Sequence, residues 1–438
     1  MGLSKKPYRG TRDFFPENKR IQDYIFEKWR FSAEQFGYEA YDGPFLEEVD
    51  LYRAKSGQEL IDEQIYSFTD RGERFVAIRP EMTPTLARMI SGVHTNLPKP
   101  IRWYSIPNLY RYEKPQRGRL REHWQFNVDV FGAPEGLGEI EIVQLIAHVY
   151  QSFGATSEHF ELLINDRKFV DFIFNDLLKL STEDSYKLYK IVDRSKKINR
   201  DATKKSLVEM KLPDEKQEVF FEYLDLKLFS DAISFAEKNG GGEKISVLKS
   251  FHQKVGELNL EEYCKFDPCI VRGLDYYTGI VFECFDKNPD NKRALCGGGS
   301  YENLLKIFDE KPLSGIGFGM GDVTMQDFLK THDLLPDLST QKVDILLTSQ
   351  IIEGETPCLL LANQLRAKGL MVSTQFGVTK LNKAFGLAEK RGAKFIGLIG
   401  DRELADKKIQ IKNLKDRNQH LCDIDEASEI VKFLNHEL

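Results

Sequence analysis

Residues 108–132, NLYRYEKPQRGRLREHWQFNVDVFG, decide the fold of the chain around them. The PQRG sequence at 115–118 is typical of a turn between two extended runs. After this turn, apolar and polar residues alternate with the period of two that is typical of a β-strand with two different faces. The apolar positions are Trp124, Phe126, Val128 and Val130, and the polar positions are His123, Gln125, Asn127 and Asp129. The pattern predicts a strand whose polar face borders water or a ligand.

Two residues of this polar face, Gln125 and Asp129, lie about 13 Å apart along a strand. With both side chains leaning inward, their amide and carboxylate are spaced to hold the two ends of one amino acid. The turn before them is strongly basic, with Arg111, Lys114, Arg117, Arg119 and Arg121 against Glu113 and Glu122. A solvated hairpin tip and a phosphate clamp made of arginine forks both fit this composition.

This stretch resembles motif 2 of the class II aminoacyl-tRNA synthetases, in the form found in the histidyl family. The resemblance implies that Arg111 binds the α-phosphate of ATP and acts in catalysis. It also implies roles for the neighbouring residues. Those expected to contact ATP with Arg111 are Glu113 and Arg119, those expected at the tRNA acceptor end are Lys114, Gln116 and Arg117, and those expected in the histidine pocket are Gln125 and Asp129.

Length and composition favour a globular protein of roughly two or three domains, because the 438 residues are 41% hydrophobic and 30% charged. No apolar run is long enough to span a bilayer, and the first residues contain no apolar signal segment. The six cysteines form no C-x-x-C pair, which is typical of reduced thiols in a cytoplasmic protein. The net charge of −6 argues weakly against a nucleic-acid partner, but a local basic patch such as the one around Arg117 can outweigh it.

The region before this stretch shows two further features of the family. An amphipathic helix is predicted at 21–36 and ends at Gly37. Pro44 then stands where class II motif 1 carries its proline, and the resemblance implies a homodimer because that motif forms the dimer interface. A simple edge strand would account for the proline equally well.

Residues 79–89, RPEMTPTLARM, resemble the histidine-binding segment of the histidyl family. The resemblance implies that Glu81 and Thr83 contact the α-amino group of histidine. The same residues are typical of a helix start, with Thr83 as N-cap and Pro84 in the first position. The two interpretations are compatible, because Glu81 precedes the helix.

The amino-acid composition changes at 166–259, where Lys, Glu, Asp and Leu dominate and runs with helical periodicity follow one another. By resemblance this is the helical insertion of the histidyl synthetases. Its basic run DRSKKINR at 193–200 could touch tRNA, although a solvated helix end is the simpler interpretation.

The run CIVRGLDYYTGIVFECF at 269–285 closely resembles the R-G-L-x-Y-Y motif of the histidyl family. The resemblance implies that Arg272 lies against the α-phosphate and the substrate carboxylate, where it acts in catalysis. It places Tyr276 and Tyr277 near the imidazole. An aromatic strand with a glycine-assisted bend is the alternative, but the motif occurs in order with the others and the family interpretation is favoured.

Two positions depart from the family pattern. Ser300, in LCGGGSYENLL, stands where the family usually has an arginine. Residues 315–325, GIGFGMGDVTM, resemble motif 3, which normally ends in an arginine that contacts ATP, and Thr324 occupies that position here. We expect either another cation in its place or a different way of holding the nucleotide.

The last part of the chain has the pattern of a separate domain. We expect a class II catalytic domain at 1–332, with an antiparallel sheet flanked by helices, and a linker at 333–342. From 343 to 438 strands and helices alternate, which predicts a small, mostly parallel α/β domain. It lacks G-x-G-x-x-G and resembles the anticodon-binding domain of the histidyl, threonyl, prolyl and glycyl group.

Taken together, the resemblance implies a cytoplasmic, homodimeric ligase that activates histidine with ATP and Mg²⁺ and then transfers it to histidine tRNA. Three alternatives remain in view. The first is a histidine-sensing regulatory subunit of ATP phosphoribosyltransferase, which the C-terminal domain and the intact VRGLDYY disfavour. The second is a sensor of uncharged tRNA, which would carry a kinase domain. The third is a neighbouring synthetase specificity, which VRGLDYY also disfavours.

Overall fold

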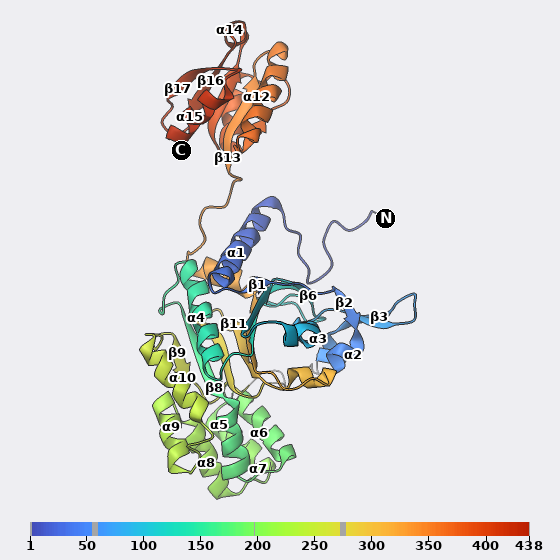
Figure 1. Ribbon diagram of the computed structural model, residues 1–438, viewed down its shortest axis with the longest axis vertical. Coiled ribbons are helices and arrows are strands. Elements are labelled where there is room, and N and C mark those ends of the chain that lie inside the picture. Colours follow the sequence, from blue (N-terminus) through green and yellow to red (C-terminus); the bar gives the residue numbers. More distant parts are fainter. Residues whose placement is uncertain (1, 55–59, 197, 272–276, 438) are drawn as a thin grey trace. The chain divides into compact units, whose positions relative to one another are not determined.

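The computed structural model describes residues 2–54, 60–196, 198–271 and 277–437. The chain forms two compact units (Figure 1). The first holds most of the chain up to Leu335, and the second holds Pro336 onward together with Pro16–Arg20. This division falls inside the segment 333–342 that the sequence predicts as a linker.

A large sheet forms the centre of the first unit. Among the described residues it has nine strands, in the order β1-β5-β7-β12-β11-β10-β8-β9, with β6 paired to β7 outside this path. The strands are β1 (Glu39–Ala40), β5 (Ile101–Ser105), β6 (Asn108–Tyr110), β7 (Glu122–Phe131), β8 (Phe160–Asp166), β9 (Cys264–Phe266), β10 (Ile280–Asp286), β11 (Ala294–Tyr301) and β12 (Gly315–Gly321). The β1–β5 and β8–β9 pairs are parallel and the other pairs are antiparallel. The predicted antiparallel sheet is therefore confirmed.

Helices α1 (Pro16–Gln35), α4 (Leu137–Ser152) and α11 (Asp322–Thr331) contribute apolar residues to the core on one face of this sheet. Trp29 of α1 stacks on Phe126 of β7, with ring centroids 5.4 Å apart. The helix predicted at 21–36 is confirmed, but α1 begins earlier, at Pro16. A proline is well suited to the first turn of a helix, because the N–H that it lacks has no partner there.

A smaller sheet lies beside helices α2 (Val49–Arg53) and α3 (Thr83–Val93). It has the order β2-β4-β3, with β2 at Leu46–Glu48, β3 at Tyr66–Thr69 and β4 at Phe75–Ile78. The prediction that Thr83 is the N-cap of its helix is wrong by one residue. Met82 is the N-cap and makes no side-chain capping bond. The side chain of Thr83 instead lines a cavity, where a capping role would have turned it toward the helix backbone.

The predicted helical insertion is confirmed as a group of helices at one end of the first unit (Figure 1). It contains α5 (Arg167–Asp171), α6 (Thr182–Ser195), α7 (Arg200–Glu209), α8 (Asp214–Leu224), α9 (Phe229–Lys238) and α10 (Ser246–Glu257). Ser181 and Asn199 cap α6 and α7 by accepting backbone N–H groups. Apolar residues such as Leu188 and Phe220 bury themselves in the same core as the large sheet.

The N-terminal segment is joined to the centre of the first unit. The carbonyl of Gly10 accepts the N–H groups of Arg121 and Glu122, at 2.9 and 3.2 Å. Nη2 of Arg12 donates to Oδ2 of the buried Asp322 at 2.7 Å, and Oδ1 of Asp322 accepts the N–H of Trp124 at 2.9 Å. These bonds hold the start of β7 against the start of α11.

The second unit is a five-stranded sheet, within the part of it that the structure describes, in the order β14-β13-β15-β16-β17. Its strands are β13 (Val343–Ser349), β14 (Val372–Thr374), β15 (Ala393–Ile399), β16 (Lys408–Asn413) and β17 (Gln419–Asp423). Only the β13–β14 and β13–β15 pairs among them are parallel. The prediction of a mostly parallel sheet is therefore wrong, because β15, β16 and β17 follow one another through short connections that force antiparallel pairing.

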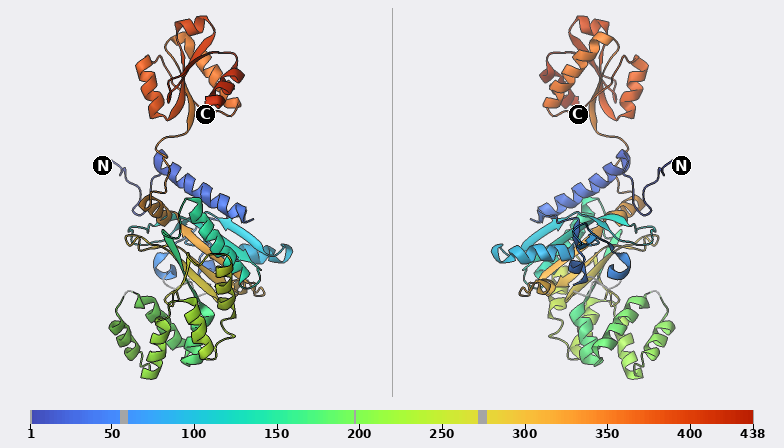
Figure 2. Two further views of the ribbon diagram at one scale, coloured as in Figure 1. Left: turned by 90° about the vertical axis from the view of Figure 1, so that its left-hand side faces the viewer. Right: turned by 90° about the vertical axis from the view of Figure 1, so that its right-hand side faces the viewer.

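Apolar residues cover both faces of this smaller sheet, and helices lie on both sides of it in Figure 2. The helices are α12 (Glu355–Ala367), α13 (Leu381–Lys390), α14 (Asp401–Ala405) and α15 (Ala427–Glu437). Along β13, Ile345 and Leu347 belong to one apolar cluster and Leu346 belongs to another. Across the described residues of both units, no helix has the length and apolar character needed to cross a membrane.

Candidate functional site

Alternating glycines in β12 clear space above the polar face of β7. In GIGFGMG the apolar residues between the glycines face the core, and Gly317 pairs with Asp129. A Cβ atom on Gly317 would lie 2.1 Å from Oδ1 of Asp129, and one on Gly319 would lie 2.7 Å from Cδ of Gln125. A larger residue at Gly317 would displace Asp129, and one at Gly319 would displace the end of the Gln125 side chain, so the glycines leave room for both polar side chains over the sheet.

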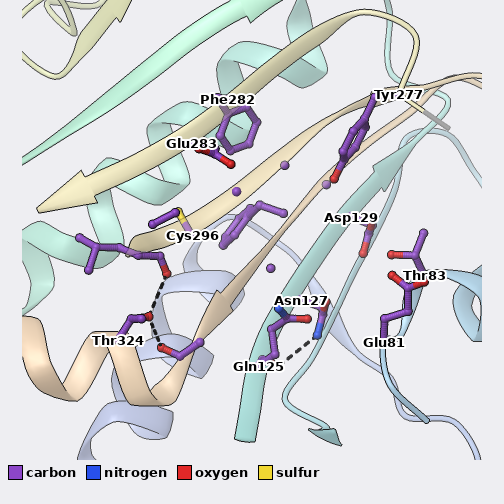
Figure 3. A pocket seen from close by; sticks show the side chains of 18 of the residues that line it. Glu81, Thr83, Gln125, Asn127, Asp129, Tyr277, Phe282, Glu283, Cys296 and Thr324 are labelled. Atoms are coloured by element: carbon purple, nitrogen blue, oxygen red, sulfur yellow. Dashed lines mark hydrogen bonds between the residues drawn. The ribbon is translucent and has the colours of Figure 1, made fainter. Parts of the chain in front are cut away.

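A cavity of about 390 Å³ lies over these glycines. The predicted site residues that line it are Glu81, Thr83, Arg111, Gln125, Asp129 and Tyr277. Residues from separate parts of the sequence thus meet at one place, as the resemblance implied. In the view of Figure 3, Asp129 and Tyr277 lie on the same side of the cavity as Glu81 and Thr83, and Glu283 and Thr324 lie on the other side.

Asp129 is a buried carboxyl of this cavity, as is Glu81. Asp129 accepts a hydrogen bond from the hydroxyl of Tyr301, with 2.5 Å between that oxygen and Oδ1. Burial raises the pKa of Asp129 to about 7, and the Tyr301 hydroxyl opposes the shift only in part. The carboxyl therefore exchanges its proton near neutral pH.

The residues expected to bind ATP lie at the other end of the polar face. Nε of Arg111 donates to the carbonyl of Pro80 at 2.9 Å, which fixes its guanidinium at the cavity wall. A smaller cavity of about 110 Å³ adjoins it and is lined by Arg111, Glu113, Arg119, His123 and Thr324, among others. The buried Glu113 forms an ion pair with Arg119, at 2.7 Å.

The environment of His123 shows how positive this end is. Burial, together with the charges of Arg111, Arg12 and Arg119, lowers the pKa of His123 to about 3. The imidazole stays neutral at physiological pH because a further cation is unfavourable there. The three arginines that contribute to this shift make the surrounding region positive.

The basic turn leads from this end into a groove of about 930 Å³. Gln116 and Arg119 exchange two backbone hydrogen bonds of 2.9 Å, and Gly118 takes a positive φ of 72°. The predicted turn at 115–118 is thus confirmed. Gln116 and Arg117 line the groove, Arg117 donates to Asn291 at 2.8 Å, and Lys114 is exposed on the loop.

The two departures from the family pattern have different surroundings. Ser300 donates to Glu139 at 2.8 Å within another cavity, and pairs with the core-facing Ile316, so it lies on the opposite face of the sheet from Asp129. Thr324 lines the ligand cavity itself, and its hydroxyl donates to the carbonyls of Gly321 and Leu295 at 3.2 and 3.4 Å (Figure 3). Thr324 therefore lines the cavity, as expected for the motif 3 position, but lacks the positive charge of the usual arginine.

Two predicted site residues, Arg272 and Tyr276, lie outside the described residues. The lining residues that were not predicted as ligand contacts include the polar side chains of Asn127, Glu283 and Tyr301. Asn127 belongs to the polar face that the alternation shows, and Glu283 is the only acidic residue in IVFECF, so both had a signal in the sequence. Among the described residues, no group of three or more His, Cys, Asp or Glu side chains could hold a metal ion.

Known proteins share this fold. The solved structures that resemble it include a histidyl-tRNA synthetase from Nostoc sp. PCC 7120, with a TM-score of 0.82 and 23% identity over 99% of this chain and 100% of that one. Another is described as an ATP phosphoribosyltransferase regulatory subunit/histidyl-tRNA synthetase from Bacillus halodurans C, with a TM-score of 0.76 and 21% identity over 91% and 99% of the two chains. At these identities the likeness shows the fold, which is that of the class II histidyl-tRNA synthetases.

Sequence comparison is more specific. The family model of histidyl-tRNA synthetase matches residues 10–322, and that of the anticodon binding domain matches residues 348–434. A histidine–tRNA ligase from Leptospira biflexa serovar Patoc (strain Patoc 1 / Ames) is 41% identical over 434 residues, which are 98% of each chain. The chain belongs to the histidyl-tRNA synthetase family. These matches support the activity of a histidine–tRNA ligase, with ATP, histidine and tRNA as its substrates, and give less support to the regulatory subunit.

Proposed function

We propose that the cavity over β12 binds histidine with its imidazole toward Asp129 and its carboxylate toward Arg111. The observation that carries this proposal is the buried Asp129 carboxyl, which faces the same 390 Å³ cavity as Arg111 and Tyr277. A pocket that pairs with polar groups of the substrate rejects side chains that leave those groups unpaired. Glu81 and Thr83 line the wall beside Asp129, where they would receive the α-amino group.

In the first step a carboxylate oxygen of histidine attacks the α-phosphorus of ATP. A bond forms between that oxygen and phosphorus, the bond to the β-phosphate oxygen breaks, and pyrophosphate leaves with the electron pair. Negative charge grows on the phosphate oxygens, so fixed cations are what the reaction needs. Arg111 provides one of them, and by the family resemblance Arg272 provides another. The reaction requires no side-chain nucleophile.

Magnesium would assist this step. Mg²⁺ usually takes only one or two protein carboxylates, completing its shell with phosphate oxygens and water. Glu283 fits this requirement, because its side chain lines both the ligand cavity and the adjoining groove. When bound with ATP, the ion would neutralise part of the phosphate charge.

In the second step the terminal ribose hydroxyl of tRNA attacks the carbonyl carbon of histidyl-adenylate and displaces AMP. We assign the loop residues Lys114, Gln116 and Arg117 to the acceptor end, because the last two line the large groove that adjoins the ligand cavity. The unit that begins at Pro336 would bind the anticodon, as the match of an anticodon-binding family model to residues 348–434 supports. The catalytic unit would then be the chain before the 333–342 linker.

We further propose a homodimer in the cytoplasm. Phe45, Leu46, Phe68 and Phe75 are exposed around the small β2-β4-β3 sheet, which follows the expected motif 1 proline. The register of the sheet places Leu46 and Phe68 on one face, and exposed apolar residues that share a face are typical of an interface. The six free cysteines fit a reducing compartment. Phe68→Glu should shift the sedimentation coefficient toward a monomer, and a wild-type protein that sediments as a monomer would refute the dimer.

The deciding experiment is histidine-dependent ATP–pyrophosphate exchange, run with each of the other amino acids as controls. We expect exchange with histidine alone, followed by charging of histidine tRNA. A histidine-binding protein without exchange would point to the regulatory alternative instead.

A further inference from the structure

The positive charge missing at Thr324 has a candidate source nearby, at Arg293. Arg293 immediately precedes β11 and is half-buried. A Cβ atom added to Gly118 would lie 3.2 Å from Cγ of Arg293 and 3.6 Å from Cγ2 of Thr324. The arginine stem and the threonine methyl therefore flank the same point of the basic turn.

The cavities around Thr324 show where a phosphate chain would run. The ligand cavity and the large groove share the lining residues Glu283, Ala294, Leu295 and Thr324. A triphosphate whose α-phosphate meets Arg111 would thus pass Thr324 on its way into the groove. Arg293 lines that groove.

Position distinguishes Arg293 from the other cations that line the groove. Its stem lies beside the same glycine, Gly118, as the methyl of Thr324, which brings this side chain next to position 324. The neighbouring cation Lys292 lines the same groove but is exposed to solvent.

We propose that Arg293 binds the β- and γ-phosphates of ATP and replaces the arginine that the chain lacks at position 324. This inference rests on the proposed function. As the bond between the α-phosphorus and the β-phosphate oxygen breaks, the departing pyrophosphate gains negative charge, and a guanidinium held beside it stabilises that charge. The threonine at 324 leaves room for the arginine stem, which reaches the same space from β11 instead of α11.

The test compares Arg293→Ala with Lys292→Ala, which removes an equal charge from the neighbouring exposed position. We expect Arg293→Ala to lower kcat/KM for ATP in pyrophosphate exchange by about 10²-fold, a loss typical of removing one fixed donor. The KM for histidine should change little, and Lys292→Ala should behave like the wild type. Equal losses in both variants, or a near-normal rate in Arg293→Ala, would overturn the assignment.

A rescue experiment separates a binding role from a structural one. The double variant Arg293→Ala, Thr324→Arg restores a cation from the helix α11 side and should regain much of the lost activity. Thr324→Arg alone should bring no gain, since Arg293 already occupies the space. A folded double variant that is no better than Arg293→Ala would contradict the proposal. If Arg293→Ala does not fold, Arg293→Gln keeps most of the stem without the charge.

The inference and the proposed function fail in different ways. A wild-type protein without histidine-dependent exchange overturns the proposed function. Binding of ATP by calorimetry then still tests Arg293, because Arg293→Ala should weaken that binding relative to Lys292→Ala. Equal ATP affinity in the two variants would overturn the inference even if exchange proceeds normally in the wild type.

Discussion

The two sheets of this protein differ in how many of their faces are covered by apolar packing. The large sheet packs helices against one face, and at its centre it leaves the other face bare, because every second residue of β12 is glycine. The five-stranded sheet carries apolar residues on both faces, as Ile345 and Leu346 of β13 show. A bare face gives up packing energy but creates room for polar side chains and a substrate. A covered sheet is stable but offers binding only at its edges and loops.

The largest expected effect comes from removing the covered sheet altogether. A chain shortened to end at Thr340 should keep pyrophosphate exchange, since the ligand cavity belongs to the first unit. Charging of tRNA should fall by about 10²–10⁴-fold, the range expected when one of two linked binding modules is lost. Exchange and charging are measured on the same preparation, with circular dichroism as the check of folding. If a folded shortened protein also loses exchange, the two sheets do not divide the work as proposed.

A matched pair of glycine variants, one in each sheet, tests whether the open face serves the substrate and the covered face serves stability. In Gly317→Ala the new Cβ would lie 2.1 Å from Oδ1 of Asp129, so the carboxylate must move, and a displacement of this kind can lower exchange by about 10²-fold. In Gly397→Ala of β15 the new Cβ would meet the side-chain ends of Leu347 and Ile409, at 2.5 and 2.9 Å.

That second substitution overpacks a covered face and should cost roughly 1–3 kcal/mol of stability. Its exchange activity should stay near that of the wild type. Thermal unfolding and exchange measured on both variants give the comparison. Loss of exchange in Gly397→Ala, or normal exchange in Gly317→Ala, would contradict the proposed difference between the two sheets.

Asp129→Ala tests the bare face by removing its carboxylate. The KM for histidine should rise by roughly 10- to 100-fold, in line with the loss of a hydrogen bond to a charged group. The KM for ATP should change little, because Arg111, Glu113 and Arg119 are untouched. The measurement is the KM for histidine and for ATP in steady-state exchange. Equal changes in the two KM values would refute the assignment of Asp129 to histidine.

A further expected effect is on stability, in Asp129→Asn. Burial raises the pKa of this carboxyl to about 7 in the folded protein, against about 3.9 in an unfolded chain. Between these values the unfolded state has lost the proton and the folded state keeps it, so the stability of the wild type falls as pH rises, and the full penalty is present above pH 7.

The amide introduced by Asp129→Asn can accept the Tyr301 hydroxyl but never ionises, so the substitution removes the penalty. The melting temperature of the variant should match the wild type near pH 4 and exceed it by several degrees at pH 8, for a penalty of roughly 4 kcal/mol. Asp166, whose pKa is also raised to about 7, is present in both proteins, so the difference between them isolates Asp129. A difference that does not grow with pH would contradict this account.

Local patterns explain what the sequence could predict. The alternation in β7 separates Gln125 and Asp129 from the core residues between them, and that separation depends only on the two-residue period of a strand. The same period was readable in GIGFGMG, where glycines recur at every second position, but its meaning depends on which strand lies beside it. By contrast, β17 gives little signal, because most of its residues are polar and exposed and the segment lacks the apolar alternation of a strand.

Contacts between distant residues could not be predicted in this way. The bond from Tyr301 to Asp129 joins positions 172 residues apart and depends on the register of β11, β12 and β7 together. The place of Arg293 beside Gly118 likewise follows from how the basic turn folds back over β11. Such contacts depend on the assembled sheet, and the sequence of a single strand does not indicate them.

The bond between Arg12 and Asp322 has a consequence for how the protein is made. These residues are 310 positions apart, and the chain grows from the N-terminus at about 5–20 residues per second. On that scale Arg12 leaves the ribosome about 15 to 60 seconds before the carboxylate that it binds. Within that interval β7 is complete 184 residues before β12 begins, so it waits about 9 to 37 seconds with one edge unpaired. The nascent chain is therefore exposed longest at the strand that later carries the substrate pocket.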